Sequence, residues 1–118
     1  MKFAEKFEDL EIWQESRRLY KCVYLRLEKC RDYSFRDQLQ RAALSVINNV
    51  SEGFERRTDK DFAHFLDLAK GSAGEARSMS YAAEDIGILT AADAQVLRDD
   101  YEILSKRIAS FQKHLRRG

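Results

Sequence analysis

Residues 40–75, QRAALSVINNVSEGFERRTDKDFAHFLDLAKGSAGE, decide how this chain folds. An α-helix turns by about 100° per residue, so side chains three, four and seven positions apart share one face. In the first half of the stretch, a set of mostly small side chains falls within about 60° of one line. The set comprises Leu39, which directly precedes the stretch, and Ala42, Ala43, Val46, Val50 and Gly53. This strip predicts a helix face that packs closely against a neighbouring helix.

The second half of the stretch predicts another helix, which starts near Thr58. Thr58-x-x-Asp61 has the spacing of an N-cap with an acidic partner. The apolar stripe that follows is bulky first and small later: Phe62, Phe65, Leu66, Ala69, Ala73 and Ala76. Gly71 and Gly74 lie inside this helix, where each costs about 1 kcal/mol relative to alanine. We therefore expect a tightly packed neighbour to offset that cost.

The rest of the chain predicts two more helices with short connections. The expected helices cover residues 9–29, 35–55 and 59–86, followed by a fourth that Thr90-x-x-Asp93 caps, with a first turn at residues 31–34 and Gly87 as a C-cap. The first helix has a stripe of Leu10, Trp13, Ser16, Tyr20, Val23, Tyr24 and Leu27. The fourth has a heptad seam of Ala94, Leu97, Tyr101, Leu104, Ile108, Phe111 and Leu115. Short connections force adjacent helices to run up and down, so we predict an all-α, antiparallel four-helix bundle in a single domain, residues 1–118.

Three motifs resemble one known family. They are Ala42-Ala43-x-Ser45-Val46-x-x-Asn49-Val50-Ser51-Glu52-Gly53, Phe65-Leu66-x-Leu68-Ala69-x-Gly71-Ser72-x-x-Glu75 and Phe7-x-x-Leu10-x-x-Trp13-Gln14. Together they resemble the bacterial four-helix-bundle proteins encoded by intervening sequences of large-subunit ribosomal RNA genes. One relative in that group is the accessory variability determinant of diversity-generating retroelements. The resemblance implies a homopentameric ring or barrel, and in that one relative the basic ring engages a reverse transcriptase and nucleic acid. Such proteins commonly carry a proline before the second helix, where this chain has Tyr33-Ser34-Phe35.

Composition sets the broad class. The 118 residues are 44% hydrophobic and 35% charged, with a net charge of +1, so the overall charge gives no argument for a polyanionic partner. No apolar run approaches the roughly 20 residues that span a bilayer, and we expect a cytoplasmic protein. Cys22 and Cys30 would lie about 12 Å apart in a helix, which is too far for a disulfide. We expect both thiols to be reduced and packed.

Charge along the chain is more informative than the total. Residues 84–102 hold six acids against one base, whereas residues 105–118 hold five bases and no acid. Lys106, Lys113 and Arg117 project within about 20° of one line, opposite the apolar seam of their helix. A second basic cluster comprises Arg17, Arg18 and Lys21. One such stripe is most often a solvated face, but repetition around an oligomer would build a continuous field for phosphates. We take these six residues as the candidate nucleic-acid-binding set.

Several aliphatic side chains point away from the predicted core. Leu44 and Ile47 lie about 160° and 100° from Val46, and Leu25 lies about 140° from Tyr20. Exposed aliphatic side chains on a small bundle indicate a protein–protein interface. We predict a homo-oligomer, which the resemblance alone makes a pentamer.

Catalytic motifs are scarce. A di-iron bundle requires Glu-x-x-His pairs, and neither His64 nor His114 follows such a glutamate. Glu52 and Glu75 could face each other as a carboxylate pair that binds a cation or transfers protons. The interpretation we favour is an interhelical polar network that fixes helix register, formed by Ser45, Asn49, Glu52, Ser72 and Glu75. We therefore expect no catalytic residues, cofactor or metal site.

Three functions are compatible with these patterns. The leading hypothesis is a non-enzymatic, self-assembling helical-bundle module that binds a protein partner, nucleic acid or both through a basic oligomer surface. The second is a dedicated reverse-transcriptase accessory protein of a diversity-generating retroelement. The third is an enzyme or metal-binding bundle that uses Glu52 and Glu75. The partner, the preference for RNA or DNA and the cellular process leave no pattern in the sequence.

Overall fold

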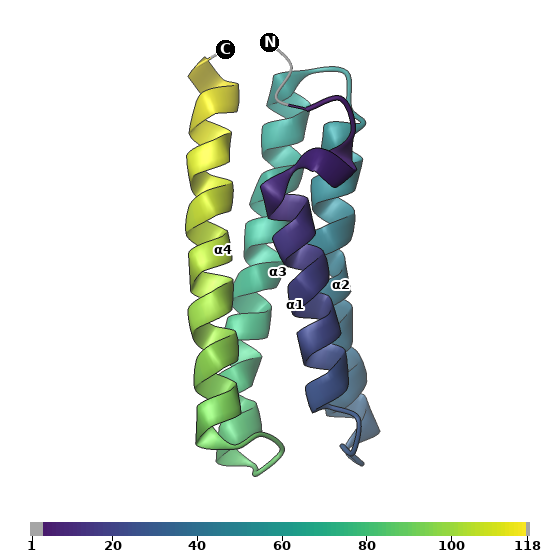
Figure 1. Ribbon diagram of the computed structural model, residues 1–118, viewed down its shortest axis with the longest axis vertical. Coiled ribbons are helices and arrows are strands. Elements are labelled where there is room, and N and C mark those ends of the chain that lie inside the picture. Colours follow the sequence, from purple (N-terminus) through teal and green to yellow (C-terminus); the bar gives the residue numbers. More distant parts are fainter. Residues whose placement is uncertain (1–3, 118) are drawn as a thin grey trace.

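Four α-helices run up and down the length of the molecule in the computed structural model, which describes residues 4–117 (Figure 1). The elements are a short 3₁₀ turn, η1 (Phe7–Asp9), followed by α1 (Glu11–Arg26), α2 (Tyr33–Phe54), α3 (Asp59–Asp85) and α4 (Ala91–Arg117). The molecule measures 46 × 19 × 19 Å, so the bundle is long and narrow. Helix α3 packs extensively against α2 and α4, whereas the contact between α1 and α4 is smaller. The predicted all-α, antiparallel four-helix bundle is confirmed.

The ends of the helices follow local capping chemistry. The Thr58 hydroxyl accepts the Asp61 N–H at 3.1 Å and starts α3, and the Thr90 hydroxyl accepts the Asp93 N–H at 3.1 Å and starts α4, as the sequence predicts. Gly87 follows α3 with a φ of +77°, a conformation that glycine adopts without strain. The prediction for the first turn was wrong, because the Asp32 carboxylate caps α2 two residues earlier by accepting the Phe35 N–H at 3.1 Å.

The core consists of the faces that helical spacing predicts for α2, α3 and α4. All six residues of the small strip on α2 are buried, as are most members of the stripe on α3 and the seam on α4. Phe65 and Phe111 are half-buried. Gly53 allows α3 to approach α2 closely, because a Cβ atom there would lie 2.8 Å from Phe62 Cδ1 and 2.8 Å from Phe65 Cβ. The first turns of α3 therefore pack directly on the backbone of α2.

The expectation for the other two helix glycines was wrong. Gly71 and Gly74 are exposed, and a Cβ atom added at either would meet nothing within 4 Å. Gly71 lies two residues from both Ala69 and Ala73, so it is rotated about 160° from the line that enters the core. No neighbour within the described chain offsets the helix-propensity cost of these residues.

The buried face of α1 agrees with the prediction only in part, since Leu10, Ser16, Val23 and Leu27 are buried as expected but the aromatic members of the stripe are not. The helix is shorter than expected, and Tyr24 is 52% exposed, whereas Ile12 and Leu19 are buried. The observed core line is rotated by roughly 60° from the predicted one. The prediction followed the aromatic rings of Trp13 and Tyr20, but both are only half-buried and cover the flank of the core rather than its centre.

Candidate functional site

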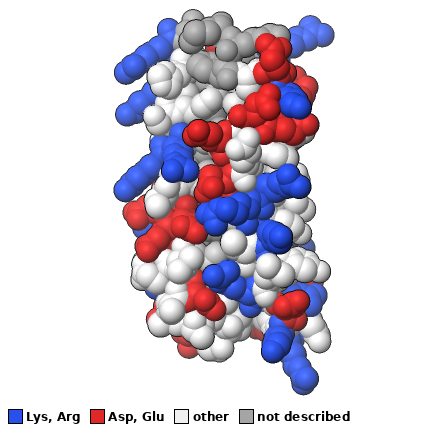
Figure 2. Space-filling model, in the orientation of Figure 1, with Lys and Arg blue, Asp and Glu red and all other residues white. Residues whose placement is uncertain are grey.

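The basic stripe occupies the second half of α4. Lys106, Lys113 and Arg117 are all exposed, and they project opposite the buried residues of the same helix. Within residues 4–117, no carboxylate lies within 4 Å of their charged groups. Figure 2 shows Lys and Arg side chains projecting from the edge of the molecule that α4 forms. These three charges are therefore free to meet a phosphate.

Two grooves flank this half of α4. A groove of about 490 Å³ separates α4 from the start of α1 and is lined by Arg107 together with Asp9 and Glu11. A second groove, of about 510 Å³, separates α4 from the start of α3 and is lined by Arg116 and Asp67, among others. Both grooves mix acidic and basic groups, so the surface most suited to a polyanion is the ridge between them.

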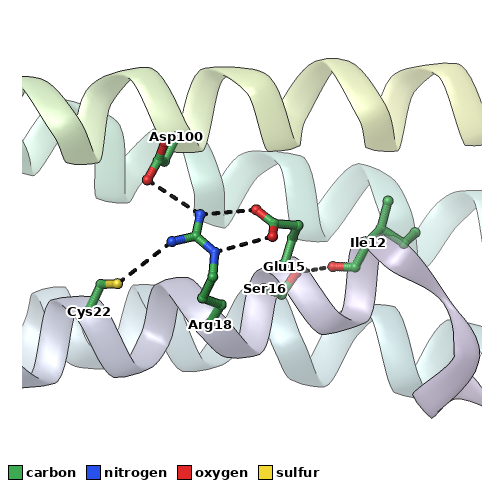
Figure 3. Close-up of polar contacts among 6 residues, drawn as sticks. All are labelled: Ile12, Glu15, Ser16, Arg18, Cys22 and Asp100. Carbon is green, nitrogen blue, oxygen red and sulfur yellow. Dashed lines mark hydrogen bonds and ion pairs between the residues drawn. The ribbon is translucent and has the colours of Figure 1, made fainter.

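The three basic residues of the cluster on α1 differ in the contacts that they make. The Arg18 guanidinium donates to both oxygens of Glu15, at 3.1 and 3.0 Å, and to Asp100 Oδ2 of α4 at 3.4 Å (Figure 3). The hydrogen bond with Glu15 raises the pKa of Arg18 and lowers that of Glu15. Two carboxylates already neutralise Arg18, which makes it a poor phosphate ligand. Arg17 stacks over the Trp13 ring at 5.7 Å, and Lys21 is exposed.

The structure does not bring the two basic clusters together within one chain. Arg18 marks the side of α1 that faces α4, and Arg17 is rotated 100° from it. On α4, Lys106 is rotated about 120° from Asp100, the residue that faces α1. The stripe on α4 and the cluster on α1 therefore point in different directions.

Three members of the predicted polar network meet between α2 and α3. The Ser72 hydroxyl donates to Ser45 Oγ at 2.9 Å, and Asn49 Nδ2 donates to the same oxygen at 3.0 Å. All three side chains are half-buried. The bond between Ser72 and Ser45 crosses from α3 to α2 and holds the two helices in one register, whereas the bond from Asn49 lies within α2.

The two glutamates do not form a pair. Ser45 faces Ser72, and because the helices are antiparallel, Glu52 and Glu75 lie in opposite directions from that point, about 15 Å apart along the axis. Glu75 accepts a 3.4 Å hydrogen bond from Gln38. The Glu52 side chain is 58% exposed, and its carboxylate lies 3.9 Å from Arg56. The idea that they form a carboxylate pair was therefore wrong, and no group of three or more potential metal ligands gathers anywhere in residues 4–117.

The aliphatic side chains predicted to form an oligomer interface do not share one surface. Leu25 and Leu44 are 49% and 41% exposed, whereas Ile47 is half-buried. Leu25 lies seven residues after Arg18 and therefore on the side of α1 that faces α4. Leu44 projects outward from α2. A contact between copies that buried both Leu25 and Leu44 would therefore use more than one face of the bundle.

Comparison with known proteins identifies the family. The family model described as the 23S rRNA-intervening sequence protein matches residues 8–110. The chain belongs to the 23S rRNA-intervening sequence protein family. The fold of this family member is similar to the crystal structure of a protein with unknown function from the S23 ribosomal protein family of Bacteroides thetaiotaomicron VPI-5482. The two chains are 18% identical, the match covers 86% of this chain and 98% of that one, and the TM-score is 0.80. At that identity the likeness shows the fold alone. No curated protein matches the chain.

Two buried polar residues of this family member were missed by the sequence reasoning. Gln112 Nε2 donates to the Ala63 carbonyl at 2.9 Å and to Asp67 Oδ1 at 2.7 Å, which joins α4 to α3. Arg98 donates to Glu84 Oε1 at 3.0 Å and stacks over the Tyr81 ring at 4.1 Å. The sequence did contain a signal for their burial. Arg98 and Gln112 are separated by two heptads and lie on one flank of the apolar seam of α4.

The two cysteines are not joined by a disulfide. Cys22 and Cys30 are free thiols and half-buried. Arg18 Nη1 lies 3.9 Å from Cys22 Sγ (Figure 3).

Among residues 4–117 of this intervening sequence protein, we find no helix with the length and apolar character that a membrane span requires.

Proposed function

We propose that this protein is a non-enzymatic, self-assembling helical-bundle module that binds nucleic acid, a protein partner or both through a basic surface. The observation that carries the proposal is the stripe of Lys106, Lys113 and Arg117, whose charges have no acidic partner within residues 4–117. Elsewhere on the chain most arginines are paired, as Arg18 is with Glu15 and Asp100. A row of unpaired cations on a rigid helix suits a polyanion such as the phosphate backbone.

Self-assembly would raise the affinity of this stripe for a polyanion. One chain offers three aligned charges, which supply few phosphate contacts. A cyclic oligomer repeats the stripe once per subunit, and the fields of the copies add around the ring. Several large aliphatic side chains, Leu25 and Leu44 among them, stand exposed on the outside of the bundle, and burying such surface favours association.

The expected binding is largely independent of base sequence. The stripe consists of flexible cations on the outside of a bundle helix, which neutralise phosphates but carry no fixed hydrogen-bonding pattern for base edges. Each neutralised phosphate releases counterions, so affinity should fall steeply with salt, and each contact adds roughly 0.7 to 0.9 to the log–log slope.

The test is an anisotropy titration at several salt concentrations on unrelated RNA and DNA oligomers. The double variant Lys106→Glu, Lys113→Glu should bind every oligomer more weakly and with a flatter slope than the wild type. The matched control is Lys29→Glu, Arg31→Glu, which makes the same change in charge in the connection between α1 and α2 and should keep the wild-type slope. Absence of binding by the wild type at low salt, or equal slopes in wild type and Lys106→Glu, Lys113→Glu, would leave a protein-partner module as the better conclusion.

A further inference from the structure

One flank of α1 carries a row of aromatic rings that the core covers only in part. Trp13, Tyr20 and Tyr24 fall within about 40° of one line along the helix, over an axial length of about 16 Å. Trp13 and Tyr20 are half-buried, and Tyr24 is 52% exposed. The Tyr20 and Tyr24 ring centroids lie 6.4 Å apart. These three residues, which we call the α1 aromatic row, therefore present aromatic surface to solvent beside the core.

The α1 aromatic row lies on the side of α1 that borders α2. Tyr24 lines a groove of about 210 Å³ between the two helices, together with Arg36 and Gln40 of α2. Arg18, whose bond to Asp100 marks the side of α1 that faces α4, is rotated about 140° from the row. The row is therefore a surface separate from the basic stripe on α4.

Two cations stand on the solvent side of the row. Arg17 and Lys21 are exposed and are rotated from it by about 40° and 80°, away from the core. Neither has a carboxylate within 4 Å in the described part of the chain. The Arg17 guanidinium lies over the Trp13 ring, 5.7 Å from its centroid. Figure 2, which has α1 in front, shows Lys and Arg side chains over the middle of that helix.

Aromatic rings beside unpaired cations match the chemistry of a single-stranded nucleic acid. Its bases expose flat faces that stack on aromatic side chains and on arginine, and every base has such a face. Its phosphates can be neutralised by Arg17 and Lys21. In a duplex the base faces are already stacked on one another, so a duplex could use only the cations. A proline-rich peptide would also pack on aromatic rings, but it would leave both cations without a counterpart.

We propose that the α1 aromatic row binds single-stranded nucleic acid, with bases stacked on Tyr20 and Tyr24 and phosphates bound by Arg17 and Lys21. This inference rests on the nucleic-acid binding proposed above, and it specifies the class of nucleic acid and a second surface for it. The exposed Glu28 lies one turn beyond Tyr24 and would repel phosphates, so the binding surface ends there. RNA and DNA share this chemistry, and the experiment below distinguishes them.

Trp13 is the only tryptophan of the chain, which makes its fluorescence a probe of this surface. The protein is titrated with single-stranded RNA and DNA oligomers, with duplexes of the same length, and with an abasic oligomer that keeps the phosphates but has no bases. A base that stacks beside Trp13 should quench its emission. We expect quenching by single strands and little change with the duplex or the abasic oligomer. The relative affinities of the RNA and DNA strands then give the preferred ligand.

Variants separate stacking from charge. Tyr24→Leu removes an exposed ring and should weaken single-strand binding about tenfold, whereas Tyr24→Phe keeps the ring and should bind as the wild type does. Tyr24→Leu should also keep the wild-type salt slope, while Arg17→Gln, Lys21→Gln should flatten it. The matched control is Tyr81→Leu, because Tyr81 is 54% exposed and lies against Arg98 on the α3–α4 side of the bundle. Circular dichroism checks that each variant is folded.

The outcomes distinguish this surface from the stripe on α4. No binding of any oligomer by the wild type at low salt would overturn both this inference and the proposed nucleic-acid binding. Binding that leaves Trp13 emission unchanged and persists in Tyr24→Leu would overturn the α1 site alone. A response of Trp13 to a proline-rich peptide but to no oligomer would overturn nucleic acid as the occupant. Weakened binding in Tyr24→Leu, with a normal slope in Lys106→Glu, Lys113→Glu, would support this site and overturn the stripe.

Discussion

Glycine has opposite roles at two positions in this bundle. At Gly53 the missing side chain lets Phe62 and Phe65 approach the backbone of α2, whereas Gly74 faces open space on α3. The first glycine enables packing, and the second only lowers the helix propensity of its segment. Identical residues inside two helices thus differ in their effect because of what lies opposite them.

Gly74→Ala should therefore stabilise the protein by about 1 kcal/mol, the usual gain for this exchange inside a helix. The measurement is the free energy of unfolding in urea. Gly53→Ala is the contrasting variant, and it should destabilise the protein, since its Cβ would lie 2.8 Å from two phenylalanine side chains. A loss of stability in Gly74→Ala would mean that a neighbour occupies that side of α3.

At the scale of the helices, the contact between α3 and α4 depends on polar groups as well as on the apolar seam. Gln112 is buried and donates to Asp67, and Arg116 lies 3.3 Å from the same carboxylate. The hydrogen bond from Gln112 is the main cause that lowers the pKa of Asp67 below its ordinary value of 3.8, with the nearby Arg116 charge assisting. The folded protein thus favours the ionised carboxylate more than the unfolded chain does.

This contact predicts a pH dependence of stability. A carboxyl whose pKa is lowered by folding contributes stability above its unfolded pKa and loses it as pH falls through the folded value. Asp67→Asn should therefore reduce the free energy of unfolding at neutral pH, and the difference from wild type should shrink as pH falls below 3.8. Urea unfolding at a series of pH values measures this, with Glu28→Gln as an exposed control. A difference that stays constant down to the lowest pH would contradict the assigned role of Asp67.

For the whole molecule, the narrow bundle leaves much of its apolar surface outside. Large aliphatic side chains stand exposed on α1, α2, α3 and α4, Leu25 and Ile103 among them. A slender shape of 46 × 19 × 19 Å has little interior in which to bury them. Association between copies would remove that surface from water and add to the stability of the fold.

The melting temperature should therefore depend on protein concentration. Anything that binds only the folded state raises apparent stability by mass action, and a second copy is such a ligand. Differential scanning calorimetry over a hundredfold range of concentration should show a rising melting temperature for the wild type. A constant value in the wild type, together with a monomer in light scattering, would argue against self-assembly.

The sequence by itself determined the helices and most of their buried faces. Helical periodicity and N-caps such as Thr58 act within a few residues, so the strip on α2 and the seam on α4 were readable without coordinates. Spacing was right only in part for the first helix, where Ser16 and Val23 are buried as predicted but half-buried aromatic rings shifted the centre of the predicted face. The alignment of the basic stripe on α4 was also visible, since it depends on one helix alone.

Only the tertiary structure decided which groups meet. Arg18 donates to Asp100, which is 82 positions away in the sequence, and Gln112 donates to Asp67, which is 45 positions away. Glu52 and Glu75 lie apart because two antiparallel helices carry them in opposite directions from Ser45. A periodic pattern fixes how a residue is rotated about its own helix axis. It contains no information on how far that helix slides along its neighbour, and packing of all four helices together sets that register.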